Sequence, residues 1–534
     1  MTEPDEASPP EPEIWDAIVI GCGMGGATIG YELARLGRRV LFLEKGLFLH
    51  GPKEDPEGPP PGHPAAQDLL RRGRWPLPIS GRTSFGPVDF HAPLGCGTGG
   101  STTLYSAQLE RFRAADFAPR AWYPDAPDAN LPEQWPVTLE QMIPFYRRAE
   151  ALFGVFGTPD PLEPDPEAPL APPPAMSARD AALFECFQAA GLHPYRSHVA
   201  VEHIGNCLEC DEKCPFGCKH DAGYRCLLPA LRDHGAMLLA RCEAMYLLTE
   251  GRRVTGVAAH WRGEELRFHA RIVVAAAGAW MTPLLLLRSR SAEWPDGLAN
   301  ASGQVGRNLM LHATDLVTVD PGERLPSAGP RKAITLNDFY DDRGYKLGTF
   351  QSVGLRLGAP VIEALLMSAT DRDPARWSAR GPDFAARAAR MAERRFGSAN
   401  LMATIMEDLP YAENRVIPDP RSGNGMRFDY VYTEELFRRS RLFQRRLVET
   451  LSPKMATAIM PFGRNNINYG HVCGTCRFGD DPRTSVLDAT NRAHDLDNLY
   501  VVDGSFFPSS GGTNPSLTIA ANALRVAGII DRRL

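Results

Sequence analysis

Two groups of residues in this chain of 534 have types and spacings suited to chemistry. The first is Gly21-x-Gly23-x-x-Gly26, which directly follows the apolar run AIVI. The first glycine permits a tight turn, the second lets backbone approach a pyrophosphate, and the third lets a helix pack closely on a strand. The N-terminus of that helix offers free N–H groups and a positive dipole end to phosphate. The spacing therefore predicts a dinucleotide site.

An acidic residue downstream supports this prediction. Glu44 lies in the next apolar run, RRVLFLEKG, 18 residues after Gly26. A carboxylate at this position accepts hydrogen bonds from an adenosine ribose, and it disfavours a 2′-phosphate. The motif does not distinguish NAD from FAD, and a glycine-rich structural turn is the alternative interpretation.

The second group is a cluster of cysteines. Four of the 11 cysteines, Cys207, Cys210, Cys214 and Cys218, have the spacing C-x2-C-x3-C-x3-C. Thiolates are good ligands for iron–sulfur clusters and for zinc. The spacing differs from the bacterial ferredoxin run, and the two separated C-x-x-C pairs of a zinc ribbon are missing. We favour an iron–sulfur cluster; zinc and metal-free buried cysteines are the alternatives. Six of the others are predicted to be packing residues: Cys22, Cys96, Cys186, Cys242, Cys473 and Cys476.

These groups need a scaffold, and the apolar pattern predicts an α/β fold. Four runs are typical of buried parallel strands, at 17–21, 38–46, 270–278 and 498–504. Helical spacing follows at 21–37 and again at 518–530. Because the strand-like runs are scattered along the whole chain, they predict one discontinuous α/β domain. The intervening stretches, above all 315–465, would form a second domain.

Composition and charge exclude several classes of protein. Hydrophobic residues make up 43% and charged residues 23% of the chain, which is ordinary globular usage rather than that of a disordered protein. No run of about 18 apolar residues supports a membrane span. The net charge is −6, so the chain lacks the excess of basic residues that is typical of nucleic-acid-binding proteins. The segment 1–13 resembles no secretory signal, so we expect a disordered tail and a cytoplasmic protein with reduced thiols.

Longer motifs bring the chain close to a known family. They are PLGCGTGGSTTLYSA at 93–107, QVGRNLMLH at 304–312, and a block at 471–525 that begins HVCGTC and contains TNPSLT. Together these motifs resemble the glucose-methanol-choline (GMC) flavoprotein oxidoreductases. The resemblance implies FAD, a Rossmann-like FAD-binding domain, a substrate domain built on an antiparallel sheet, and oxidation of an alcohol, often on a sugar or polyol.

The resemblance also implies roles for individual residues. His471 is the expected base, since a histidine accepts a proton near neutral pH, and Asn514 is expected to orient the substrate oxygen. The second glycine-rich loop has no histidine, so FAD is expected to be non-covalent. The expected cofactor-binding residues are Gly21, Gly23, Gly26, Glu44, Gly99, Gly100, Ser101, Asp503, Gly504, Asn514 and Pro515.

The same resemblance divides the chain. The FAD-binding domain is expected at 14–50, 85–130, 205–314 and 466–534, with the cysteine cluster at 207–218. The substrate-binding domain and loops are expected at 51–84, 131–204 and 315–465. Candidates for the wall of the substrate pocket are Phe339, Tyr340, Asp341, Asp342, Phe350 and Gln351.

The expected partners are a small alcohol or sugar and an electron acceptor. Some bacterial members of the family carry a cysteine-rich segment in a similar place that binds a 3Fe–4S cluster, although the spacing here departs from theirs. A 3Fe–4S or 4Fe–4S cluster would pass electrons singly to the acceptor, as in a dehydrogenase. The alternatives are an oxidase that reduces oxygen to hydrogen peroxide, and a non-redox lyase on the same scaffold.

Overall fold

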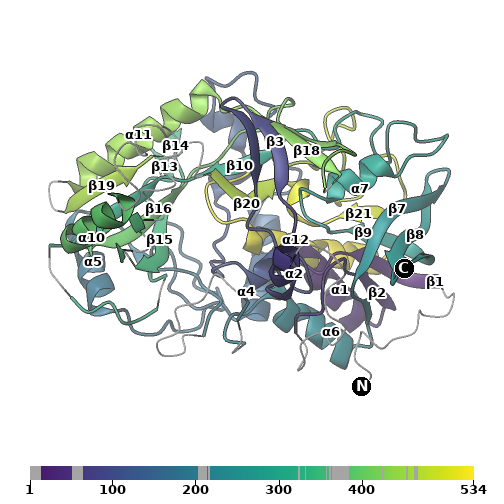
Figure 1. Ribbon diagram of the computed structural model, residues 1–534, viewed down its shortest axis with the longest axis horizontal. Helices are drawn as coiled ribbons and strands as arrows, with labels where there is room; N and C mark the ends of the chain where they lie inside the picture. The colour runs from purple at the N-terminus through teal and green to yellow at the C-terminus, as the bar shows by residue number, and fades with distance from the viewer. Residues whose placement is uncertain are drawn as a thin grey trace.

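The structure is a computed structural model (Figure 1), and its described residues form three sheets of four or more strands and two two-stranded ribbons, joined by helices and loops. It describes a set of ranges separated by gaps: 14–50, 64–202, 213–214, 217–322, 325–330, 332–356, 358–359, 362–363, 384–397, 399–423, 425–452, 455–461 and 467–534.

The largest sheet has a parallel centre, with strands in the order β6-β2-β1-β9 and β21 also paired with β9. The long strand β9 also continues into an antiparallel meander with β8 and β7. The strands of this sheet are β1 (Ile14–Ile20), β2 (Val40–Leu43), β6 (Met237–Leu239), β7 (Cys242–Glu250), β8 (Arg253–Trp261), β9 (Glu264–Ala275) and β21 (Leu499–Val501). The four strands predicted from the sequence are therefore confirmed as β1, β2, β9 and β21.

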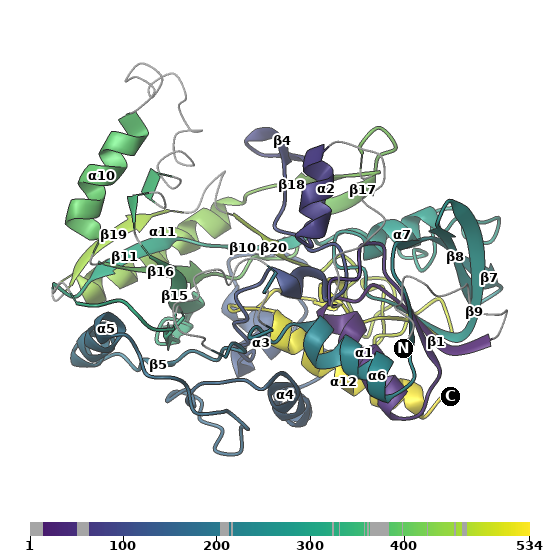
Figure 2. The same ribbon diagram turned by 60° about the horizontal axis from the view of Figure 1, so that its bottom comes forward.

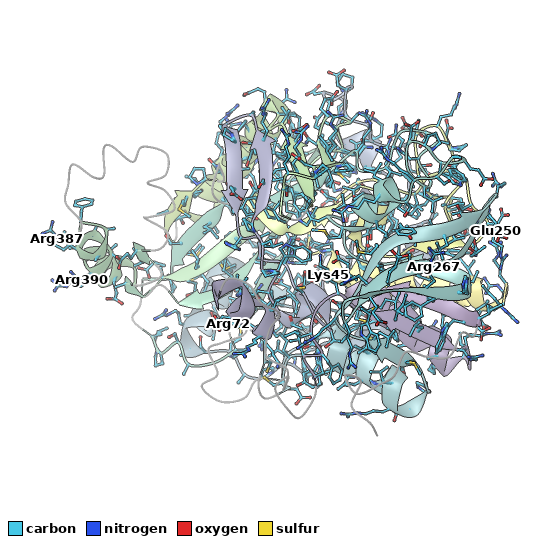
Figure 3. All side chains as sticks on the ribbon, turned by 45° about the vertical axis from the view of Figure 1, so that its right-hand side comes forward. Lys45, Arg72, Glu250, Arg267, Arg387 and Arg390 are labelled. Carbon is cyan, nitrogen blue, oxygen red and sulfur yellow. The ribbon has the colours of Figure 1, made fainter. Side chains whose placement is uncertain are left out.

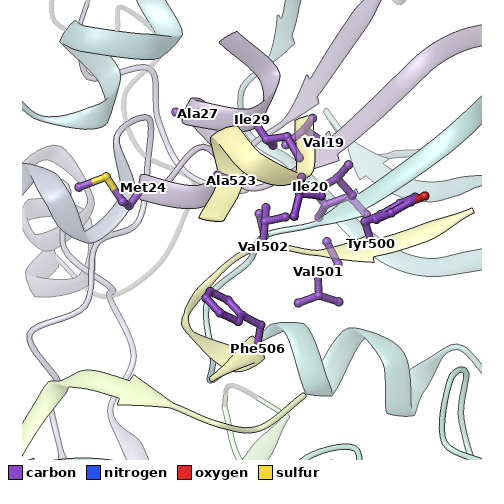
Figure 4. Packing of buried hydrophobic residues seen from close by; sticks show 14 of the residues in the cluster. Val19, Ile20, Met24, Ala27, Ile29, Tyr500, Val501, Val502, Phe506 and Ala523 are labelled. Carbon is purple, nitrogen blue, oxygen red and sulfur yellow. The ribbon is translucent and has the colours of Figure 1, made fainter. Parts of the chain in front are cut away.

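Helices that pack on one another cover this sheet. Helix α1 (Met24–Arg35) contacts both α12 (Ser516–Asp531) and α6 (Leu228–Asp233), and α12 also contacts α4 (Leu139–Phe153). The four helices gather at one side of the molecule (Figure 2). Val19 of β1, Ile29 of α1, Val501 of β21 and Ala523 of α12 belong to one buried apolar cluster (Figure 4). The predicted helices at 21–37 and 518–530 are confirmed as α1 and α12.

The second sheet is antiparallel throughout, in the order β19-β11-β16-β15-β12-β5. Its strands are β5 (Tyr195–Arg196), β11 (Leu316–Asp320), β12 (Ile334–Leu336), β15 (Thr349–Arg356), β16 (Asn400–Ile405) and β19 (Ala456–Met460). Helices α5 (Ala178–Ala189) and α11 (Glu434–Leu451) bury apolar side chains with this sheet. Helix α10 (Phe384–Phe396) lies at its outer end and exposes Arg387 and Arg390 (Figure 3).

A third sheet and a two-stranded ribbon complete the frame. The third sheet has the order β17-β18-β3-β4, and the ribbon pairs β10 with β20. These strands are β3 (Ile79–Thr83), β4 (Gly86–Phe90), β10 (Met310–Ala313), β17 (Arg415–Pro418), β18 (Met426–Tyr430) and β20 (Ile467–Cys473). The remaining elements are α2 (Pro64–Arg71), α3 (Ala114–Phe117), α7 (Thr282–Arg288), β13 (Asp341–Asp342), β14 (Tyr345–Lys346), η1 (Gly100–Thr103), η2 (Pro119–Trp122), η3 (Gly223–Leu227) and η4 (Gly504–Phe506).

The architecture is the predicted combination of a Rossmann-type α/β part and an antiparallel sheet. The exact division of the chain between the two domains remains a prediction. Helix α4, placed in the substrate part by that division, packs on α12. None of the helices in the described ranges is both long and apolar enough to cross a bilayer.

Candidate active site

The turn between β1 and α1 is closed by contacts that only glycine allows. Gly21 has a φ of +94°, and a Cβ there would lie 2.5 Å from the carbonyl oxygen of Ala276. A Cβ on Gly26 would lie 2.0 Å from the carbonyl oxygen of Gly21. Gly23 caps α1 without a side-chain hydrogen bond, so the first N–H groups of the helix remain available to an anion.

Glu44 follows β2 and lines the same cavity as these glycines. The backbone N–H of Cys22 donates to its Oε2 at 3.0 Å, and the N–H of Gly46 donates to its Oε1 at 2.8 Å. Burial raises the pKa of the carboxyl, and these N–H groups act in the opposite direction. An ionised carboxylate has about four acceptor sites, so it keeps capacity for hydroxyl donors.

The second glycine-rich loop touches the first. A Cβ on Gly100 would lie 2.7 Å from Cα of Gly23, and the N–H of Gly99 donates to the carbonyl of Cys22 at 3.0 Å. Gly100 and Ser101 line the cavity, whereas Gly99 does not appear in its wall. The two loops therefore form one continuous surface of backbone.

The cavity of about 620 Å³ extends from these loops to the ribbon formed by β10 and β20. Of the predicted cofactor-binding residues, all except Gly26 and Gly99 line its wall: Gly21, Gly23, Glu44, Gly100, Ser101, Asp503, Gly504, Asn514 and Pro515. The volume falls within the range of about 300–1,000 Å³ usual for cofactor and ligand sites.

Asp503 contacts the protein rather than offering an open carboxylate. Its Oδ2 accepts from the N–H of Gly278 at 2.8 Å and from the hydroxyl of Thr282 at 2.5 Å. Its Oδ1 accepts from the N–H and the hydroxyl of Ser505. Asp503 therefore joins the end of β21 to the start of α7 while it borders the cavity.

His471 and Asn514 both line the cavity, although they come from different elements. His471 lies on β20, and Asn514 precedes α12. Desolvation by burial, together with the positive charge of Lys332, holds the pKa of His471 well below its usual value. The imidazole ring is therefore neutral at neutral pH. Oδ1 of Asn514 is buried and has no hydrogen-bond partner in the structure, so it is available as an acceptor.

The loop that carries Asn514 is held from behind by buried charges. The N–H of Gly511 donates to Oε1 of Glu407 at 3.0 Å, and the N–H of Gly512 donates to the hydroxyl of Tyr340 at 2.8 Å. Lys346 lies between Glu407 and Asp116, with its Nζ 2.6 Å from each carboxylate. The side chain of Lys346 is fully buried.

The antiparallel sheet supplies the opposite side of the cavity. Of the six residues predicted for this wall, Gln351 lines it; its Oε1 is buried and has no hydrogen-bond partner in the structure. The predictions for the other five are wrong as regards the cavity wall. Phe339 and Phe350 belong to an apolar core, and Tyr340 binds Asp116. Sequence analysis missed Lys332, which lines the cavity and donates to Gln108 at 3.3 Å.

Two of the four clustered cysteines, Cys207 and Cys210, lie outside the described residues. Cys214 and Cys218 are buried, with their sulfur atoms 3.3 Å apart. The described ranges contain no group of three or more His, Cys, Asp or Glu side chains arranged to hold a metal ion. The predicted metal site therefore remains a prediction. Of the six cysteines predicted to be packing residues, Cys186 is half-buried and the other five are buried: Cys22, Cys96, Cys242, Cys473 and Cys476.

The chain that follows the cysteine cluster packs on the second glycine-rich loop. Nζ of Lys219 donates to the carbonyl of Thr103 at 2.6 Å, and the N–H of Ala222 donates to the hydroxyl of Thr102 at 2.9 Å. Nε2 of His50 is 2.8 Å from Oδ1 of Asp221. The cysteine segment is therefore connected directly to backbone that borders the cavity.

Comparisons with known proteins agree with this geometry. Two family models, both described as GMC oxidoreductase, match residues 173–314 and 384–523. Paromamine 6'-oxidase of Streptomyces fradiae is 30% identical, over 96% of this chain and 91% of that protein. 2-Methyl-1,2-propanediol dehydrogenase of Mycolicibacterium austroafricanum is 27% identical, over 97% of this chain and 95% of that protein. A crystal structure of pyridoxine 4-oxidase from Mesorbium loti, at 21% identity, superposes with a TM-score of 0.65 over 96% of this chain and 99% of that one.

Proposed function

Because this chain belongs to the GMC oxidoreductase family, we propose that it binds FAD and oxidises a hydroxyl group of a small alcohol or sugar to a carbonyl. The observation that carries the proposal is a single cavity with glycine-rich backbone at one end and His471 with Asn514 at the other. Relatives whose names record the oxidation of paromamine and of a propanediol support a hydroxyl-bearing substrate.

The residues around the cavity fit FAD. The uncapped start of α1 suits a pyrophosphate, and Glu44 retains acceptor capacity for ribose hydroxyls. Gly21 and Gly100 carry no side chain and lie close to neighbouring backbone, so a flat ligand can approach the backbone of the two loops. When bound, FAD supplies a two-electron acceptor for a hydride.

The chain's own residues supply binding and proton transfer. His471, held neutral, accepts the proton of the substrate hydroxyl, which leaves the carbinol carbon free to lose its hydride. Asn514 orients the oxygen of the hydroxyl group that is oxidised, and its buried Oδ1 and Oε1 of Gln351 are acceptors suited to hydroxyl groups of the substrate. A substrate with several hydroxyl groups would satisfy both of them, which favours a polyol or sugar over a simple aliphatic alcohol.

Anaerobic titration tests the proposed reaction. Protein loaded with FAD is mixed with polyols, sugars and amino sugars, and the flavin absorbance near 450 nm is followed. We expect bleaching by at least one member of the panel, with the matching carbonyl product. If no alcohol in the panel bleaches the flavin, the result would contradict the proposal and favour the alternative of a non-redox lyase. Reoxidation by air would identify an oxidase, which the relative named as an oxidase favours, and reoxidation only by a dye would identify a dehydrogenase.

Substitution of Gly26 by alanine tests the FAD site. The added methyl group would lie 2.0 Å from the carbonyl oxygen of Gly21, so α1 must move away from the turn. We expect purified Gly26→Ala protein to carry less FAD, measured as the ratio of absorbance at 450 nm to that at 280 nm. Gly528→Ala is the matched control, because its added methyl group meets only the end of a flexible arginine at 3.7 Å and should retain FAD. Equal FAD content in the two variants would contradict the assignment.

Within the same proposal, Cys207, Cys210, Cys214 and Cys218 hold an iron–sulfur cluster that accepts electrons singly and passes them to an external acceptor. The burial of Cys214 and Cys218, and the contacts of Lys219 and Ala222 with the second loop, support it. We expect anaerobically purified protein to contain iron and acid-labile sulfide, and Cys214→Ser to lose both while FAD remains. Zinc in place of iron would favour the alternative metal, and neither metal would contradict the assignment.

A further inference from the structure

His312 forms a contact with His471 that the proposed reaction has not yet used. The two rings come from β10 and β20, where the pairing of the strands is irregular between Met310 and His312. Their Nδ1 atoms are 2.8 Å apart, and the ring planes are nearly perpendicular, at 88°. His312 is fully buried.

The other side of His312 fixes its tautomer. Its Nε2 lies 3.2 Å from the carbonyl oxygen of Ser510 and 3.0 Å from that of Gly511. Carbonyl oxygens only accept hydrogen bonds, so Nε2 of His312 carries a proton and donates. Burial lowers the pKa of His312, which keeps the ring neutral, and a neutral ring has only one N–H group. Its Nδ1 is therefore an acceptor.

The contact between the rings then determines the tautomer of His471. Because Nδ1 of His312 accepts, Nδ1 of His471 must carry the proton and donate. The unprotonated nitrogen of His471 is consequently Nε2, on the side of the ring away from His312. His471 lines the cavity, whereas His312 does not.

We propose that His312 is a positioning residue that holds His471 as the Nδ1–H tautomer, with Nε2 as the proton acceptor, and stabilises the imidazolium formed during alcohol oxidation. This inference rests on the proposed function. The proton of the substrate hydroxyl moves to Nε2, and the hydrogen bond from Nδ1–H to His312 strengthens as charge develops. An aspartate has the same role in hydrolytic triads, whereas here the acceptor is a neutral ring.

The charged groups around the pair are consistent with this role. Asp116 and Glu407, with Lys346 between them, lie behind His312, and their carboxylates favour positive charge on it. Lys332 acts on His471 from the cavity side and opposes positive charge there. A new positive charge on the pair is therefore better accommodated toward His312 than toward the substrate.

Two substitutions of His312 separate positioning from packing. Asparagine places an acceptor oxygen near the site of Nδ1, whereas leucine fills the space without one. We expect His312→Leu to slow flavin reduction about 10- to 100-fold at saturating substrate. The substrate concentration that gives half of the maximal rate should change little. The acidic limb of its pH profile should move to lower pH, and His312→Asn should recover most of the rate. His260→Gln, at an exposed histidine, is the control.

The outcomes of this experiment are distinct. A wild-type rate and pH profile in His312→Leu would overturn the proposal, and so would an asparagine variant as slow as the leucine variant. Selective ¹⁵N-histidine NMR of the wild-type holoenzyme gives a readout that needs neither turnover nor a variant of His312, with His471→Gln identifying the signals. We expect His471 to show a protonated Nδ1 at pH 7. A protonated Nε2 would overturn the inference even in an enzyme that oxidises alcohols, whereas failure of the alcohol panel with a protonated Nδ1 would overturn only the reaction.

Discussion

Replacement of His471 by glutamine is expected to slow the reduction of bound FAD by its alcohol substrate about 100- to 10,000-fold, the usual contribution of a general base. Glutamine retains hydrogen-bonding groups in the cavity wall but cannot take up a proton at neutral pH. Rapid-mixing spectroscopy under anaerobic conditions measures the rate directly. The FAD content should stay at the wild-type level, because the glycine loops and Glu44 are untouched.

The pH dependence gives a second check on His471. Only the neutral ring accepts a proton, and its pKa lies well below the usual value because burial and the nearby charge of Lys332 disfavour the protonated form. In the wild-type enzyme, the rate of flavin reduction should be constant through neutral pH and should fall only when the pH drops through this lowered pKa. His471→Gln should lose this limb. Wild-type kinetics in the variant would contradict the assignment of His471 as the base.

Replacement of Lys346 by methionine is expected to lower the free energy of unfolding by about 3–5 kcal/mol, the usual result of removing one partner from a buried ion pair. Lys346 is the cation 2.6 Å from both Asp116 and Glu407, and all three side chains are almost fully buried. Without it, two carboxylates would face each other in the interior. Denaturant unfolding with FAD bound, followed by fluorescence, measures the loss.

A surface pair provides the control for Lys346. Arg72 forms an ion pair with Asp68 at 3.0 Å, but both side chains are more than half exposed, and Arg72 lies away from the cavity (Figure 3). Arg72→Met should therefore change stability by no more than about 1 kcal/mol. We also expect Lys346→Met to weaken catalysis in the folded fraction, since Glu407 holds the backbone of Gly511 near Asn514. Similar stability in the two variants would show that the buried charges do not hold this loop.

Local sequence patterns were sufficient to predict the strand–helix–strand unit formed by β1, α1 and β2. Gly21, Gly26 and Glu44 serve steric or hydrogen-bonding needs within one strand–helix–strand unit, so their spacing alone carries the information. The apolar runs of β9 and β21 were also predictable, because strands buried on both faces are continuously hydrophobic. His471 and Asn514 were found only through the resemblance to a family, since neither residue lies in a pattern that predicts its neighbours.

The supporting residues could not be predicted in this way. Asp116, Lys346 and Glu407 meet only because three distant segments converge, and no spacing along the chain relates them. His312 lies in a motif that the sequence analysis recognised, yet its partner is 159 residues away. The prediction for the wall of the substrate pocket failed for a similar reason. Four of its six residues lie at 339–342, away from the cavity, and Phe350 is part of the apolar core, whereas its neighbour Gln351 lines the cavity.

The discontinuous parallel sheet determines when the active site can assemble during synthesis. Strand β1 pairs first with β2, but its other neighbour, β9, is complete only at residue 275, and β21 and α12 are made later still. The nascent chain must therefore keep an exposed apolar strand edge until β21 has been made. Chains that stop before α12 would lack Asn514 and one wall of the flavin cavity, so ribosome-bound intermediates should acquire FAD only after α12 has been made.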